Sequence, residues 1–381
     1  MEEWKEYKLG EISSLSTGFP FNGNKYSKIG TRVVRGDNVT IGQLRWDTEK
    51  DKRWNEYFER EADFSLRAND IVIGMDGSRV GMNRAQIKDS DLPLLLAQRV
   101  ACVRNNEKSI QKFIYYHIFS KRFVDYVKSI HTGTSIPHIS LKQIGDFPIT
   151  LPPLPIQQKI AHILSSLDDK IEVNRRINDN LEQQAQALFK SWFVNFEPFK
   201  DGEFVESELG MIPEGWKVGT LGDLIEVKYG KDHKRLNDGD IPVYGSGGIM
   251  RYVDKSLFIG ESVLIPRKGT LNNVMYVNRD FWTVDTMFYS KMKMSNIAIF
   301  VYLFLSKKDL ASMNSGSAVP SMTVDILNKM SLVIPNEKAF EDFNNIVSSL
   351  FFQMSNNSKE TTHLTTLRDT LLPKLMSGEL S

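Results

Sequence analysis

Residues 151–199 contain the pattern that most constrains the fold. Prolines at 152, 153 and 155 precede a run with no glycine or proline before Pro198, and proline is tolerated in the first turn of a helix but not in its interior. Within this run, positions 160, 164, 167, 171, 181, 185, 188 and 192 are apolar at alternating steps of four and three. The pattern predicts a long coiled-coil helix over 151–199. At 1.5 Å per residue, roughly forty residues form a rod of about 60 Å, so we expect a spacer.

Two features of this helix indicate what it contacts. Asn174 and Asn178 occupy seam positions where apolar residues are expected, and polar seam residues set helix register at a cost in stability. Other apolar residues widen the stripe beyond what one partner helix needs. These include Ile163, Ile177, Phe189 and Phe193. Two interpretations remain open: the flanking domains cover these residues, or another protein binds them.

The chain contains an internal repeat. WKEYKLGEI, which begins at Trp4, matches WKVGTLGDL, which begins at Trp216, and Gly18 matches Gly230 in the same register. The loop HTGTSIPHIS (131–140) matches NSGSAVPSMT (314–323). Self-similarity at a fixed offset indicates duplicated structural units.

The second match continues in one register into another long apolar-periodic stretch near the C-terminus. We predict that this second helix packs antiparallel to the first and that the aligned seam positions form the contact. These positions are Leu164, Leu167, Ile171, Asn174, Leu181 and Leu188 on the first helix, and Val347, Leu350, Met354, Asn357, Leu364 and Leu371 on the second.

The repeat and the strand pattern define a fold class. Short β-branched and aromatic runs, broken by glycine, asparagine and aspartate, predict the strands of an irregular α+β domain in each half. We therefore expect an α+β fold in which two similar α/β domains are separated by two long antiparallel coiled-coil helices, with pseudo-two-fold symmetry. The predicted segments are the first domain (1–150), the first helix (151–199), the linker and second domain (200–335), and the second helix (336–381).

Composition excludes several classes of protein. No apolar run is long enough to span a bilayer, and the polar start MEEWKEYK does not resemble a signal peptide. The single cysteine, Cys102, excludes an internal disulfide and a cysteine zinc site. We expect a cytoplasmic protein. Its net charge of +1 is nearly neutral, whereas most free-standing nucleic-acid binders are basic. Either the chain does not bind DNA, or its basic surface is local or supplied by partners.

Patterns of catalytic or cofactor sites are missing from the sequence. There is no GxxxxGK[ST] phosphate loop, no HExxH pair and no GxSxG elbow, and the six histidines are scattered. We therefore expect a chain without catalysis, metal or cofactor of its own.

Loops in both halves suit DNA recognition. DGSRVGMNRAQ (76–86) supplies arginine, which reads guanine bidentately, and asparagine, which reads adenine. The second half has the basic run KYGKDHKR (228–235) and the matching turn RKGTLNN (267–273). For any one loop, a solvated surface turn is the alternative. The predicted DNA-binding residues are Arg35, Arg79, Asn83, Arg84, Thr132, Gly133, Thr134 and His138 in the first half, and Lys231, His233, Lys234, Arg235, Lys268, Asn272, Asn273, Ser315, Gly316 and Ser317 in the second.

Taken together, these motifs resemble the specificity (S) subunit of type I restriction-modification enzymes. The resemblance rests on the two WKxxxLGEI-type openings, the two GxxxP loops, PxxxQQKIAxIL (153–164), LFKSWFVNFEPF (188–199), ELGMIPEGW (208–216) and LRDTLLPKLMSGEL (367–380). It covers essentially the whole chain and is weakest inside the two domains.

The resemblance implies two target-recognition domains, each reading one half of an asymmetric bipartite double-stranded DNA sequence, with the helices setting the gap. It also implies two modification subunits that bind S-adenosylmethionine and methylate adenine, and restriction subunits that move and cleave DNA. Ile163, Ile177, Phe189 and Phe193 are then expected to bind a partner subunit. Two alternatives remain: a coiled-coil scaffold with two protein-binding domains, and a module taken from a fused restriction-methylation polypeptide.

Overall fold

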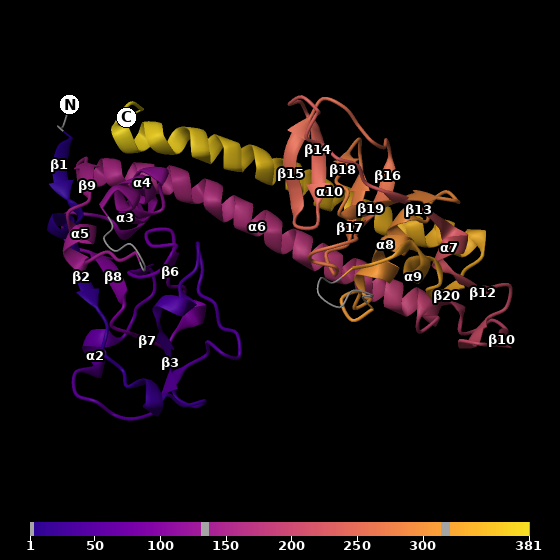
Figure 1. Ribbon diagram of the computed structural model, residues 1–381, viewed down its shortest axis with the longest axis horizontal. Helices are drawn as coiled ribbons and strands as arrows, with labels where there is room; N and C mark the ends of the chain where they lie inside the picture. Colours follow the sequence, from indigo (N-terminus) through magenta and orange to yellow (C-terminus); the bar gives the residue numbers. More distant parts are fainter. Residues whose placement is uncertain (1–3, 131–136, 314–320, 381) are drawn as a thin grey trace. The chain divides into compact units, whose positions relative to one another are not determined.

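The computed structural model describes residues 4–130, 137–313 and 321–380. The chain forms two compact units: unit 1 comprises Met1–Glu172 and Thr361–Ser381, and unit 2 comprises Val173–Glu360. Each unit holds one mixed α/β domain together with part of each of two long helices, α6 (Leu154–Phe193) and α10 (Glu337–Ser377) (Figure 1).

Unit 1 contains a four-stranded antiparallel sheet and a three-stranded mixed sheet. The first has the order β2-β8-β5-β6, with strands Ser13–Thr17, Val100–Asn105, Ile71–Gly74 and Arg84–Gln86. The second has the order β4-β3-β7, with strands Arg53–Trp54, Thr31–Val34 and Leu94–Leu96. Strand β1 (Lys5–Lys8) pairs with β9 (Pro148–Leu151). The helices are α1 (Leu9–Ile12), α2 (Glu61–Phe64), α3 (Gln111–Ile118), α4 (Lys121–Ile130) and α5 (Leu141–Gly145).

The strand alternation of the four-stranded sheet explains the layers of unit 1. Successive side chains of a strand point to opposite faces. Ile71 and Ile73 on β5 pack in one apolar cluster with Phe113 of α3, whereas Val72 packs in another cluster with Val34 of β3. The four-stranded sheet is therefore buried on both faces, by helices on one side and by the three-stranded sheet on the other.

Unit 2 repeats this plan strand for strand. Its four-stranded sheet has the order β13-β19-β16-β17, with strands Ile225–Tyr229, Met287–Met292, Glu261–Pro266 and Met275–Asn278. Its three-stranded sheet has the order β15-β14-β18, with strands Gly248–Val253, Ile241–Gly245 and Trp282–Thr283. The pair β12 (Lys217–Thr220) and β20 (Ser331–Ile334) matches β1–β9, and a hairpin of β10 (Phe204–Ser207) and β11 (Gly210–Pro213) is added. The helices are α7 (Leu221–Leu224), α8 (Ala298–Ser306) and α9 (Val324–Asn328). The predicted duplicated α+β fold is confirmed.

The repeated opening motif performs the same packing in both units. Leu9 is fully buried and its amide donates to the carbonyl of Phe147 at 2.9 Å. Leu221 is also fully buried, and its amide donates to the carbonyl of Met330 at 2.8 Å. The motif thus joins the start of each domain to the strand that leads into its long helix.

The repeated glycine of this motif is required by a close backbone approach. A Cβ on Gly18 would lie 1.9 Å from the carbonyl oxygen of Leu96, and one on Gly230 would lie 2.0 Å from the carbonyl oxygen of Val284. No side chain fits at either distance.

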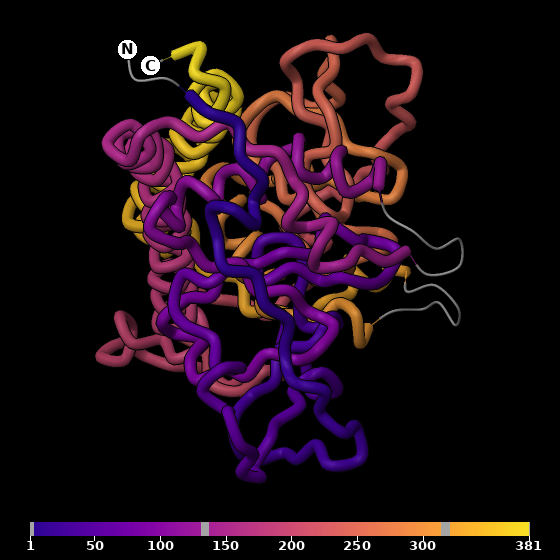
Figure 2. The backbone as a smooth tube through the Cα atoms, turned by 90° about the vertical axis from the view of Figure 1, so that its left-hand side faces the viewer, coloured from indigo at the N-terminus to yellow at the C-terminus, as the bar shows by residue number. Residues whose placement is uncertain are grey.

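The two ends of the described chain lie together in unit 1 (Figure 2). A Cβ on Gly378 would come within 2.9 Å of the Trp4 indole, and Trp4 packs against the same apolar cluster as Leu371. The closing segment of α10 is therefore part of the first domain's core.

Polar side chains join α6 and α10 within each unit. In unit 2, Asn174 Nδ2 donates to Glu360 Oε2 at 2.8 Å, and Asn357 Nδ2 donates to Asn178 Oδ1 at 2.8 Å. Residue numbers rise along one helix as they fall along the other, so the helices are antiparallel. In unit 1, Arg368 Nη1 lies 2.9 Å from Asp168 Oδ1.

The predicted seam residues are buried to different degrees. Leu164 and Val347 are fully buried, as is Asn174, and Leu181 is 7% exposed. The remaining members are half-buried: Leu167, Ile171, Leu188, Leu350, Met354, Asn357, Leu364 and Leu371.

The partner-binding prediction is wrong for two of its four residues. Phe189 and Phe193 are 6% and 7% exposed. Their rings pack against Phe300 and Phe343 in the core of unit 2, so a partner cannot reach them. Ile163 and Ile177 are half-buried. Within the described ranges, no helix combines the length and apolar character needed to cross a membrane.

Candidate nucleic-acid interface

Unit 1 contains a cleft of about 760 Å³ lined by four separate segments of the chain. Four arginines, Arg35, Arg45, Arg79 and Arg99, line it together with two aspartates, Asp37 and Asp76. One wall is aromatic and includes Phe19, Phe21 and Tyr26. The cleft thus has a local excess of positive charge in a chain whose net charge is only +1.

Strand pairing brings two of these segments together. Strands β3 and β7 are parallel, with Arg32, Val33 and Val34 opposite Leu94, Leu95 and Leu96. Parallel strands end at the same edge of a sheet, so the residues that follow them meet there. Arg35 follows β3, and Gln98 and Arg99 follow β7 by a short turn.

Arg35 is held at the cleft by its neighbours. Its guanidinium carbon lies 5.6 Å from the centre of the Tyr26 ring, and its Nη2 is 3.6 Å from Asp37 Oδ2. Its backbone amide donates to Oδ1 of the fully buried Asn38, whose Nδ2 donates to the carbonyls of Arg45 and Lys50. Asn38 therefore fixes the loop that carries both cleft arginines, Arg35 and Arg45.

Asp76 connects two other cleft residues. Its Oδ1 forms a hydrogen bond with His138 Nδ1, and its Oδ2 lies 3.4 Å from Arg99 Nη1. The predicted DNA-binding residue His138 is thus placed beside the cleft, in contact with a carboxylate that also holds an arginine.

Neighbouring residues 79, 83 and 84 have different environments. Arg79 is exposed, and no carboxylate in the described part of the chain forms an ion pair with it. Asn83 is half-buried on the cleft wall. Both remain predicted DNA-binding residues.

The structure contradicts the predicted DNA-binding role of Arg84. Arg84 is 7% exposed, and its guanidinium donates to the carbonyls of Gly81 at 2.6 Å and Phe119 at 3.2 Å. Burial also lowers the pKa of this guanidinium. Because strand neighbours point to opposite faces, Arg84 points inward when Asn83 faces the cleft, and the prediction that Arg84 contacts DNA is wrong.

Arg45, Asp76, Gln98 and Arg99 are among the cleft residues that were not predicted as DNA-binding from the sequence. Gln98 and Arg99 begin the β-branched run QRVACV (98–103), whose pattern indicates only a strand, and both are exposed. Their position depends on the parallel pairing of β3 with β7, for which the sequence carries no local signal.

In unit 2, the predicted basic residues lie between β13 and β14 and between β16 and β17. Lys231, Lys234 and Arg235 are exposed, and His233 is half-buried. Trp282 Nε1 donates to the carbonyl of Lys231 at 2.9 Å, which anchors this segment. Lys268 is exposed in the other turn.

The side-chain amides of Asn272 and Asn273 form hydrogen bonds to neighbouring loops, although Asn272 is exposed. Asn272 donates to Asp309 Oδ1 at 3.0 Å and accepts from the amide of Ala311 at 2.9 Å. Asn273 donates to the carbonyl of Ser246 at 2.8 Å. Both side-chain amides hold the turn that carries Lys268, and Asn272 and Asn273 remain predicted DNA-binding residues.

Six predicted residues of the two GxxxP loops lie outside the described residues: Thr132, Gly133, Thr134, Ser315, Gly316 and Ser317. Across residues 4–130, 137–313 and 321–380, no cluster of three or more histidine, cysteine, aspartate or glutamate side chains could hold a metal ion.

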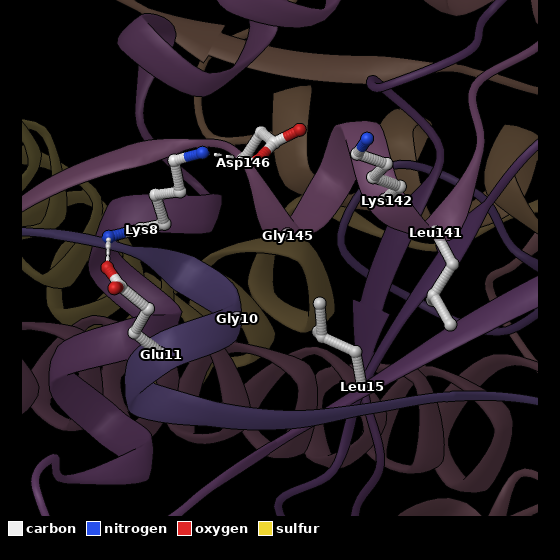
Figure 3. A pocket seen from close by; sticks show the side chains of 8 residues that line it. All are labelled: Lys8, Gly10, Glu11, Leu15, Leu141, Lys142, Gly145 and Asp146. Carbon is white, nitrogen blue, oxygen red and sulfur yellow. Dashed lines mark hydrogen bonds and ion pairs between the residues drawn. The ribbon is translucent and has the colours of Figure 1, made fainter.

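A smaller pocket of about 360 Å³ lies beside the opening motif of unit 1 (Figure 3). Lys8 Nζ is 2.8 Å from Asp146 Oδ1, and the Lys8 amide donates to Glu11 Oε2 at 2.6 Å. Most of the charged groups at the pocket rim are therefore bonded to other protein groups. This pocket belongs to the packing of the motif.

Comparison with known proteins gives a consistent result over the full length. The family described as "Type I restriction modification DNA specificity domain" matches residues 1–183 and 213–362. The type I restriction enzyme MjaIX specificity subunit of Methanocaldococcus jannaschii is 29% identical, over 99% of this chain and 96% of its own length. The type I restriction enzyme HindI specificity subunit of Haemophilus influenzae is 25% identical, over 100% of both chains.

A solved structure shares the fold. The S subunit of a type I restriction-modification system from M. genitalium superposes with a TM-score of 0.61, covering 98% of this chain and 96% of that chain at 19% sequence identity.

Proposed function

Because this chain belongs to the type I restriction modification DNA specificity family, we propose that it selects the DNA sequence on which a type I restriction-modification complex acts. Each α/β domain reads one half of a bipartite double-stranded DNA target, and helices α6 and α10 set the gap between the halves. The full-length likeness to two specificity subunits supports this proposal, as does the duplication of one domain plan in both units.

The arginine-lined cleft of unit 1 is the observation that carries the proposal. Arginine donates two parallel hydrogen bonds to guanine O6 and N7. Glutamine pairs with adenine in a different way, because its amide nitrogen donates to N7 and its amide oxygen accepts from the N6 amino group. Arg79, Arg99 and Gln98 are exposed at this cleft. Arg35 and Arg45 add positive charge that suits the phosphate backbone.

The chemistry is assigned to other subunits. Two modification subunits bind S-adenosylmethionine and methylate adenine in the selected sequence, and restriction subunits move and cleave DNA. A net charge near zero is consistent with partners that supply part of the DNA-binding surface. Apolar residues left exposed on the long helices of unit 2 are candidates for subunit contact: Val173 (46% exposed), Ile346 (44%) and Phe352 (70%).

Co-expression with a modification subunit tests the proposal. Mapping methylated adenines in the host genome should give one bipartite motif with a fixed gap. Removing one heptad from α6 should change the gap and leave both half-sites intact. Arg79→Ala should alter or weaken recognition of one half-site. Arg60→Ala is the matched control, because Arg60 pairs with Asp63 away from the cleft.

The alternative is a helical scaffold with two protein-binding domains. It would be favoured if the chain formed a stable complex while methylation showed no sequence preference, or if no methylation appeared and Arg79→Ala left DNA binding unchanged. Either result would overturn the proposed function.

A further inference from the structure

We propose that Arg99 reads a guanine in the half-site bound by unit 1, and that Asp76 and His138 position its guanidinium for this contact. The inference rests on the proposed function and deepens it by assigning one base position to one side chain. It is carried by the contacts of Asp76 and by the contrast with the equivalent place in unit 2.

The Arg99 side chain is exposed but oriented. Its side chain is 67% exposed at the cleft, and Nη1 lies 3.4 Å from Asp76 Oδ2. A guanidinium is planar and carries five donors in a rigid fork. A carboxylate beside one terminal nitrogen therefore restricts the plane of the fork while other donors stay available to a ligand.

Asp76 is itself fixed on both sides. His138 Nδ1 contacts its other carboxylate oxygen. The backbone around it is joined to both neighbouring segments: Gly77 N donates to Pro137 O at 3.0 Å, and Met75 N donates to Arg99 O at 3.2 Å. Less conformational freedom is then lost when Arg99 binds its target, which is how preorganisation increases affinity.

The carboxylate of Asp76 favours a base edge over a phosphate as the target of Arg99. Asp76 beside the guanidinium repels a phosphate group but not the edge of a base pair. Guanine presents two acceptors, and the amino group of its paired cytosine donates to a carboxylate. An arginine and an aspartate side by side therefore match one G·C pair.

The equivalent place in unit 2 has different chemistry. Asp76 and His138 form an isolated β-bridge, and Lys268 and Ser321 form the corresponding bridge. Val100 of β8 pairs with Gly74, and Met287 of β19 pairs with Pro266 in the same way. Arg99 and Thr286 directly precede these two residues, so they occupy equivalent places in the two units. The backbone contact is also repeated, since Arg267 N donates to Thr286 O at 2.9 Å.

Aspartate, histidine and arginine in unit 1 are thus replaced by lysine, serine and threonine in unit 2. The backbone scaffold is the same and only the side chains differ. This is the property expected of a position that makes two duplicated domains read two different sequences. Lys268, placed where Asp76 stands in unit 1, is then the base-reading residue of this position in unit 2.

The experiment is methylome mapping of single variants co-expressed with the modification subunit. The motif methylated with the unsubstituted protein should contain a guanine in the half-site of unit 1. Arg99→Ala should lower the preference for that guanine over other bases by roughly 5- to 150-fold, the equivalent of about 1–3 kcal/mol for one bidentate contact. Arg99→Lys should not restore the preference, because an ammonium cannot make the bidentate contact. Asp76→Asn should relax the same position less strongly. Lys268→Ala should affect only the other half-site.

The outcomes separate the inference from the proposed function. Equal loss of methylation at all sites, without a change in base preference, would identify Arg99 as a phosphate contact and overturn the inference alone. Relaxation at a base other than guanine, or no change with Asp76→Asn, would also overturn it. If the DNA methylated with the unsubstituted protein showed no bipartite motif at all, the proposed function itself would be overturned. Arg60→Ala serves again as the control that should leave the motif unchanged.

Discussion

Replacing Asn174 by leucine should stabilise unit 2. Asn174 is fully buried, and Nδ2 donates to Glu360 Oε2 at 2.8 Å. Its Oδ1 is buried and accepts no hydrogen bond from the residues that the structure describes. A buried acceptor without a partner costs about 1–3 kcal/mol, and Asn174→Leu removes that cost.

The opposing losses are smaller. The hydrogen bond to Glu360 is worth about 0.5–1.5 kcal/mol, and the carboxylate of Glu360 is exposed, so water can replace the lost donor. Leucine is also the residue expected at this seam position. The net expectation is a gain of about 1–2 kcal/mol, which for a unit of this size raises Tm by roughly 2–8 °C.

The assay is differential scanning calorimetry of the full chain, with Asn178→Leu as the matched control. Asn178 lies one turn further along α6, and its amide is fully used. It donates to Met354 O and to Ser358 Oγ, both at 3.1 Å, and accepts from Asn357 Nδ2. Removing it leaves Asn357 without this acceptor, so Asn178→Leu should lower the free energy of unfolding by about 1–3 kcal/mol.

The two substitutions should change Tm in opposite directions. If Asn174→Leu destabilised unit 2, or if both variants shifted Tm equally, the orphaned oxygen would not carry the cost assigned to it. A stabilised Asn174→Leu variant should also lose part of its helix register, since polar seam residues specify register at a cost in stability.

Three further predictions concern the core of unit 1. Gly18→Ala forces a Cβ toward the carbonyl oxygen of Leu96 and should lower the free energy of urea unfolding by about 1–3 kcal/mol. Gly23→Ala should not lower it, because the added Cβ meets no atom of the described residues within 4 Å. Burial lowers the pKa of His117 from 6.5 to about 3. The stability contributed by neutral His117 is therefore complete above pH 6.5 and is lost as the pH falls toward 3. His117→Phe should make the free energy of urea unfolding depend less on pH between about pH 7 and pH 4. Burial raises the pKa of the Cys102 thiol to about 12, so iodoacetamide at about pH 8 should label it only after unfolding, and labelling of the folded chain would contradict its burial.

Local patterns in the sequence were sufficient to predict the architecture. An apolar seam at steps of four and three needs a helix and a partner for it, and α6 and α10 satisfy both needs. The matched opening motifs predicted two equivalent domains, because the fully buried Leu9 and Leu221 fill the same place in each. These features depend on residues close together in the chain, which is why a single sequence reveals them.

The site depended on contacts between distant segments. Arg35, Arg79 and Arg99 meet only because β3 pairs parallel with β7 and the turn between β5 and β6 lies beside them. Asn83 and Arg84 are adjacent, yet sheet register turns one toward the cleft and the other into the core.

The long helix shows the same division between sequence and tertiary structure. Its apolar stripe was visible in the sequence, but only packing decided which residues of the stripe were covered. Phe193 is buried against the second domain's core, whereas Val173 remains exposed. Periodicity determines which residues share a face. The assignment of that face to a core, a partner or a ligand depends on which distant segment packs against it, and that information lies in the tertiary structure.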